Sequence, residues 1–244
     1  MITLDDAVEL TRTGDVWIFR GSSGADRAIR GLTNAPVNHV GMAVVLDDLP
    51  PLMWHAELGR GLVDVWTGTH QRGVQLHDLR AAVLQWGRRY QQRGWLRQLS
   101  GPVDASMEDA VLRTIARLDG TPFPSTARLA ARWARGRLPD LSSLREWLAT
   151  PLSRLPLRAA GGPGTGGGAE GSPEGDEPAP GLESAYCAEV VAVTYENMGL
   201  LPRRRDPNWY DPGRFWSGDD LKLADGFSLG GEIPVSLPPG AARC

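Results

Sequence analysis

The sequence predicts an α+β fold, because strand-like segments fill its first hundred residues and amphipathic helices follow them. The chain has 244 residues, of which 41% are hydrophobic and 23% charged. This length and composition suit one domain with a buried core, so we expect a single domain over residues 1–244.

The expected strands are short runs of apolar and β-branched residues, bounded by turn residues. Gly14 and Asp15 precede the first run, and prolines separate the second run from the third. We expect the second and third runs to pair as a hairpin. The expected strands cover residues 16–20, 38–46, 52–58, 73–76, 83–90 and 94–99.

Two helices are expected from the spacing of apolar residues. Residues 104–118 carry apolar side chains at intervals of three and four, and Gly120 closes the segment. Residues 184–198 show the same spacing, with Ser184 as the expected N-cap and Gly199 after the last turn.

Two biased segments separate these helices. Residues 128–158 hold seven arginines against two acids, which predicts an Arg-rich helical insertion. Its basic face is either a solvated outer face or a surface for peripheral membrane contact or for an acidic partner. In residues 159–181, thirteen of 23 residues are Gly or Pro and four are acidic, so we expect a disordered loop within the domain.

Charge and targeting signals exclude several classes of protein. The net charge of −3 argues against nucleic-acid binding as the main role. No apolar run approaches the roughly 20 residues that span a bilayer, and the first residues are acidic where a signal peptide is basic. Two cysteines are too few for a disulfide framework, so we expect a cytoplasmic protein.

Cys187 is the candidate nucleophile. With Ser184 as N-cap, Cys187 falls in the first turn of its helix, where the helix dipole and free N–H groups favour a thiolate. The same N–H groups can hold an oxyanion. The alternative is an inert cysteine in the core.

His39 is the candidate base, because it opens an apolar strand where a polar ring needs a partner or a purpose. Met53, His55 and Glu57 alternate along the next strand and share one face, so His55 or Glu57 can orient the ring of His39. The four histidines show no metal-binding spacing, and no phosphate-binding loop is present. We therefore expect neither a metal nor a cofactor.

Three motifs in this order resemble the permuted NlpC/P60 papain-like family, the YiiX/YaeF-like group. They are Gly-Asp, an apolar strand and Arg-Gly (14–21), a His-Val-Gly strand (38–45), and a helix opening Tyr-Cys-Ala-Glu-Val-Val (186–191). The resemblance covers most of the chain outside residues 128–181. It implies a circularly permuted papain-like domain, with a small antiparallel sheet packed on helices.

The resemblance also implies a cysteine hydrolase acting on an amide or ester acyl bond. Cys187 takes the place of the nucleophile and His39 that of the base. His55 stands where many members carry Glu, which is similar to lecithin:retinol acyltransferase-like proteins, and Glu57 is the second candidate for that role. The substrate is then a small peptide-like or lipid-like acyl compound. The alternatives are a lipid acyl hydrolase or acyltransferase, and a non-catalytic binding protein on the same frame.

Overall fold

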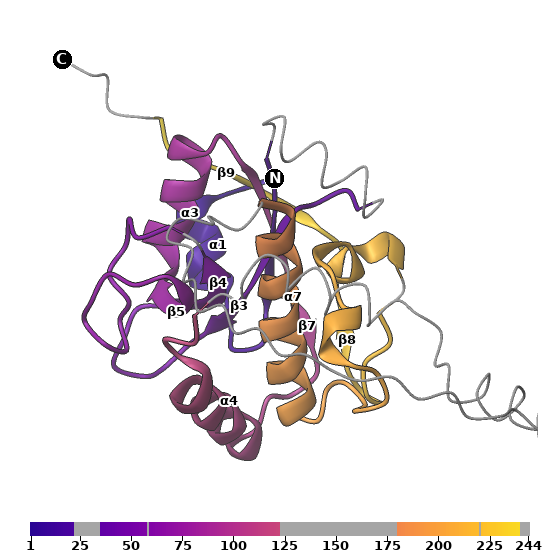
Figure 1. Cartoon of the computed structure of the whole chain (residues 1–244). Helices are drawn as coiled ribbons and strands as arrows, with labels where there is room; N and C mark the ends of the chain where they lie inside the picture. The colour runs from indigo at the N-terminus through magenta and orange to yellow at the C-terminus, as the bar shows by residue number, and fades with distance from the viewer. Residues whose placement is uncertain (22–34, 58, 123–179, 220, 240–244) are drawn as a thin grey trace, which may run out of the picture.

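The computed structural model describes residues 1–21, 35–57, 59–122, 180–219 and 221–239. Within these residues the chain forms a seven-stranded sheet and four α-helices, so the predicted α+β class is confirmed (Figure 1). None of the described helices combines the length and the hydropathy that a membrane-spanning segment needs.

The main sheet has the strand order β1-β9-β6-β2-β3-β4-β5. Its first pair, β1 with β9, is parallel, and every other neighbouring pair is antiparallel. The expectation of a small antiparallel sheet is therefore too narrow. The strands are β1 (Ile2–Thr3), β2 (Val16–Arg20), β3 (His39–Val44), β4 (Leu52–Glu57), β5 (Gly73–Asp78), β6 (Arg93–Arg97) and β9 (Ile233–Ser236); β7 (Leu99–Ser100) pairs separately with β8 (Ser228–Leu229).

Helices cover both faces of this sheet and divide the core in two. On one face, α1 (Leu4–Leu10) and α3 (Leu79–Arg89) pack on side chains such as Trp17, Phe19 and Met53. On the other, α4 (Ala105–Leu118) and α7 (Pro180–Asn197) pack on the alternate residues of the same strands. We call these the α3 face and the α7 face.

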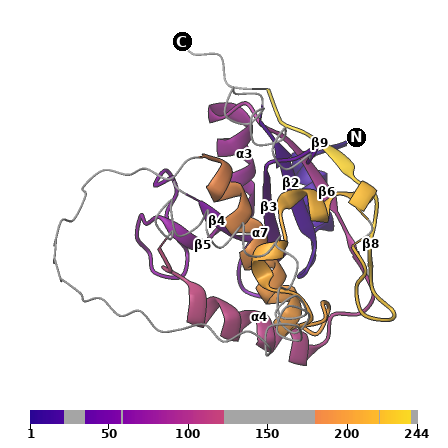
Figure 2. The ribbon, with the colours of Figure 1, turned by 45° about the vertical axis from the view of Figure 1, so that its right-hand side comes forward.

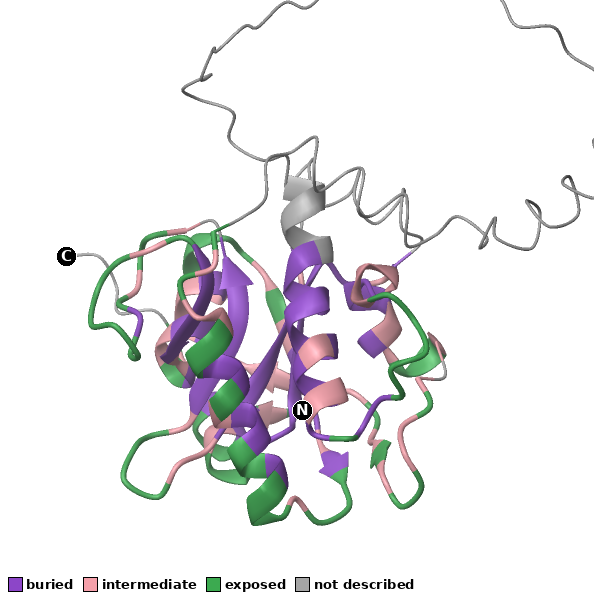
Figure 3. Ribbon diagram, turned by 60° about the horizontal axis from the view of Figure 1, so that its bottom comes forward, coloured by how far each residue is buried: buried purple, intermediate pink, exposed green. Residues whose placement is uncertain are grey.

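The α7 face is built by direct packing of α7 on β3 and β4 (Figures 1 and 2). The indole Nε1 of Trp54 donates a hydrogen bond of 3.0 Å to Thr194 Oγ1, which ties β4 to the helix. Figure 3 shows that the described turns of α7 are largely buried where they meet the sheet. Short 3₁₀ helices η2 (Pro207–Trp209), η3 (Pro212–Phe215) and η4 (Ser217–Asp219) follow the helix in the chain.

Helix α3 corrects one prediction. The sequence predicts a strand over residues 83–90, but residues 83–89 lie in a helix that begins at Leu79, and residue 90 is the C-cap of that helix. The Asp78 side chain caps the start of the helix by accepting a hydrogen bond from Ala81 N at 2.7 Å. The buried residues Leu79, Ala82, Val83 and Trp86 recur at helical spacing. The predicted strand begins at Val83, so it leaves out Leu79 and Ala82, which are the first half of the helical pattern.

Helix α7 begins earlier than predicted. It starts at Pro180, so the expected N-cap at Ser184 is wrong, and the expected loop 159–181 loses its last two residues to the helix. Proline is well placed at the start of a helix because its missing N–H has no intrahelical partner there. The rest of that loop, and the Arg-rich insertion 128–158, lie outside the described residues.

Candidate functional site

Five polar side chains meet on the α3 face of the sheet, and we call them the histidine cluster. Strand β3 contributes one member, strand β4 two, and strand β5 two, because alternate residues of paired strands point to the same side. All five are buried. The members are His39, His55, Glu57, Gln75 and His77.

Hydrogen bonds order three of these side chains. The amide nitrogen of Gln75 donates to the backbone oxygen of Glu57 at 3.1 Å, so its oxygen faces His77 Nε2, at 3.0 Å. That contact places the proton of His77 on Nε2 and leaves Nδ1 as an acceptor. His55 Nε2, at 3.0 Å from His77 Nδ1, is then the donor.

Trp86 covers the cluster from α3. Its ring lies edge-on to His39 and His55, with centroid distances of 4.6 and 4.7 Å. The rings of His39 and His55 are 5.4 Å apart and also edge-on. The two histidines are therefore in contact, but His55 holds His39 by packing and uses its own Nε2 to bond His77.

Burial controls the charges in the cluster. Removal from water lowers the pKa of His39 to about 3 and that of His77 to about 4, and it takes the pKa of His55 well below its usual value. Burial raises the pKa of Glu57 to about 7, although the Trp86 side chain opposes this by hydrogen bonding to the carboxylate. At neutral pH the three rings are uncharged.

Three buried polar atoms of the cluster have no hydrogen-bond partner among the described residues. They are His39 Nε2, His55 Nδ1 and Glu57 Oε2. Buried polar atoms are nearly always satisfied in folded proteins, so three such atoms in one cluster require an explanation.

Cys187 lies on the other side of the sheet. It is fully buried in the apolar core of the α7 face, together with residues such as Val40 and Ala56. Because α7 begins at Pro180, Cys187 is about two turns inside the helix rather than in its first turn. The dipole and the free N–H groups act within the first turn, so this expected source of thiol activation is absent at Cys187.

The structure thus brings together three of the four predicted site residues. His39, His55 and Glu57 share the histidine cluster, as strand alternation predicts, while the sheet separates them from Cys187. Gln75 and His77 are absent from the predicted site because the predicted fourth strand ends at Leu76. The alternation of Val74, Gln75, Leu76 and His77 carries the signal that the strand continues.

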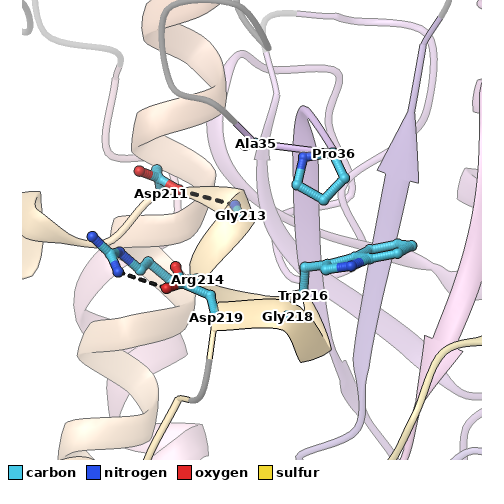
Figure 4. Close-up of a pocket in the computed structure, with 8 residues that line it drawn as sticks. All are labelled: Ala35, Pro36, Asp211, Gly213, Arg214, Trp216, Gly218 and Asp219. Atoms are coloured by element: carbon cyan, nitrogen blue, oxygen red, sulfur yellow. Dashed lines mark hydrogen bonds and ion pairs between the residues drawn. The ribbon is translucent and has the colours of Figure 1, made fainter.

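A pocket of about 360 Å³ opens at another place, between the residues that precede β3 and the 3₁₀ helices η3 and η4 (Figure 4). Arg214 pairs with Asp219 at 2.8 Å, and its guanidinium lies 3.9 Å from the centroid of the Trp209 ring. Asp211 Oδ1 accepts from Gly213 N at 3.0 Å. The lining residues are Ala35, Pro36, Asp211, Gly213, Arg214, Trp216, Gly218 and Asp219.

Comparison of the sequence with protein-family models and with curated proteins finds no match.

Proposed function

We propose that this chain is a ligand-binding protein on a permuted papain-like frame, in which Cys187 is a core residue. The observation that carries the proposal is the separation of Cys187 from His39 by the sheet between the α7 and α3 faces. A nucleophile and its base need to approach within hydrogen-bond reach. The small number of cysteines supports a cytoplasmic location.

The pocket of Figure 4 is the ligand site in this proposal. Its volume of about 360 Å³ suits a small molecule. Trp216 offers a flat apolar surface, Asp219 accepts hydrogen bonds and Arg214 donates them. A small peptide-like compound matches these three residues. Its amide N–H groups can donate to Asp219, its carbonyl oxygens can accept from Arg214, and its apolar side chains can pack on Trp216.

Calorimetric titration of the full chain with a panel of N-acetyl dipeptides tests the proposal. We expect saturable binding of at least one compound, weakened about tenfold or more when Trp216→Ala removes an aromatic contact. Trp66→Ala is the matched control, because Trp66 is 48% exposed and does not line the pocket. Absence of binding across the panel, or equal loss in both variants, would contradict the proposal.

The second candidate is the thiol hydrolase that the motif order implies. The packing of α7 on β3 and β4 favours it, because the helix that carries Cys187 contacts the strand that carries His39. The two candidates differ in the reactivity of the thiol. Alkylation of Cys187 is followed against pH in a Cys244→Ser background, with and without His39→Ala.

A hydrolase requires fast alkylation with an apparent pKa well below about 8.5, and a profile that changes when His39 is removed. Slow alkylation, at a rate that does not change when His39 is replaced by alanine, supports the binding protein instead. A lipid-like acyl compound, with peripheral membrane contact through residues 128–158, is a variant of the hydrolase proposal. Co-sedimentation of the full chain with anionic liposomes tests that variant.

A further inference from the structure

We infer that His55, Glu57 and His77 form a binding site for a zinc ion on the α3 face of the sheet. The inference goes beyond the proposed ligand site, because these residues do not line the pocket of Figure 4. Each offers one ligand atom, and the three atoms lie within 4.8 Å of one another. Two imidazoles and a carboxylate are a ligand set that zinc accepts.

The distances suit a tetrahedral ion. Two ligand atoms on one tetrahedral zinc lie about 3.3 Å apart, given bonds of about 2.0–2.2 Å. His55 Nε2 is 3.0 Å from His77 Nδ1, and His77 Nδ1 is 4.0 Å from Glu57 Oε2. The first separation is shorter than the required value and the second is longer, and all three ligand atoms lie within 4.8 Å of one another. Binding of the ion therefore requires small rotations of the three side chains.

The surroundings prepare His77 as a ligand. Gln75 Oε1 accepts a hydrogen bond from His77 Nε2–H, and the Gln75 amide is itself oriented by the hydrogen bond that it donates to the Glu57 backbone oxygen. The lone pair of His77 Nδ1 therefore points toward His55 and Glu57. Hydrogen bonding of the second ring nitrogen is the usual way in which proteins fix a metal-binding histidine.

The unpartnered Glu57 Oε2 is the independent observation that points to a ligand. Glu57 is only 4% exposed, and this oxygen has no hydrogen-bond partner among the described residues although it faces His77. A cation in the cluster satisfies that oxygen. On binding zinc, His55 takes the tautomer with its proton on Nδ1, so that Nε2 supplies a lone pair, and the three protein ligands leave the fourth tetrahedral position to a non-protein ligand.

Zinc titration of the tag-free, chelator-treated full chain tests the inference. We expect one zinc ion per chain and a rise of the unfolding temperature with zinc concentration. His77→Gln and Glu57→Gln each weaken binding about tenfold or more, because each removes one ligand atom. The matched control is His70→Gln, which alters the exposed fourth histidine and leaves binding unchanged.

Cobalt(II) spectra of the unmodified protein keep the test decisive if a variant fails to fold. Intense visible bands of tetrahedral cobalt, displaced by one equivalent of zinc, support the site. Substoichiometric zinc binding, the pale spectrum of hydrated cobalt, or full binding that persists in both His77→Gln and Glu57→Gln would overturn the inference. Dipeptide binding by the pocket is measured separately, so the two proposals fail independently.

Discussion

The two faces of the sheet differ in chemistry although the same strands build both. On the α7 face, side chains such as Val40, Met42 and Trp54 pack against an apolar helix. On the α3 face, the same strands place His39 and His55 beneath Trp86. Alternation of polar and apolar residues is commonly taken to mean one wet face and one dry face. Here both faces are covered, so the polar positions form a buried cluster.

Stability of the α7 face should depend on packing, and Trp54 gives the largest test. Its side chain is fully buried, so Trp54→Ala should lower the free energy of unfolding by about 3–5 kcal/mol through lost contacts and a cavity. Urea unfolding measures the change. Trp66→Ala, at an exposed position, should stay within about 0.5 kcal/mol of the unmodified protein. Equal effects at the two positions would mean that the α7 face is not close-packed.

Stability of the α3 face should depend on pH. The folded pKa of His39 is about 3 and that of His77 about 4, so below about pH 6.5 the unfolded chain takes up protons that the folded chain does not. His55 acts in the same direction. Glu57 opposes them, because its folded pKa of about 7 keeps a proton that the unfolded chain releases above about pH 4.5.

Three histidines against Glu57 leave a net uptake of about two protons by the cluster on unfolding near pH 5.5. Asp119, whose pKa burial raises to about 6, offsets part of that uptake, so the free energy of unfolding should fall by roughly 1–2 kcal/mol per pH unit on acidification. Urea unfolding at about pH 7, 6 and 5 in the presence of chelator measures this slope. His77→Gln should make it shallower, and Trp66→Ala, at an exposed and uncharged position, should leave it unchanged. A slope that His77→Gln does not alter would show that the cluster is hydrated in solution.

The sequence predicts most elements but only part of the cluster. Strand β2 has its predicted bounds, because Gly14 and Asp15 mark its start, and α4 lies within one residue of its predicted place. The members of the histidine cluster come from three strands, so no regular spacing along the chain identifies His55, Glu57 and His77 as a set of metal ligands. His55 and His77 meet only through the register in which His55 lies opposite Gln75.

The sequence misplaces Cys187 within its helix for a local reason. Ser184 is a good N-cap by residue type, yet the helix continues back to Pro180. Tertiary packing decides which face of the sheet the helix covers. The pattern of residues along one strand does not predict that choice. The motifs alone therefore put Cys187 and His39 in one site, while the fold puts the sheet between them.

The smallest expected effect concerns the polar contact on the α7 face. Thr194→Val keeps the shape of the side chain but removes the acceptor of the buried Trp54 N–H, which should lower the free energy of unfolding by about 1–2 kcal/mol. Thr69→Val, at an exposed position, is the matched control. Because the loss comes from an unsatisfied donor, it should shrink when Trp54→Phe removes that donor as well. A double-mutant cycle measures the difference. Equal losses with and without the Trp54→Phe substitution would assign the effect to packing rather than to the hydrogen bond between Trp54 and Thr194.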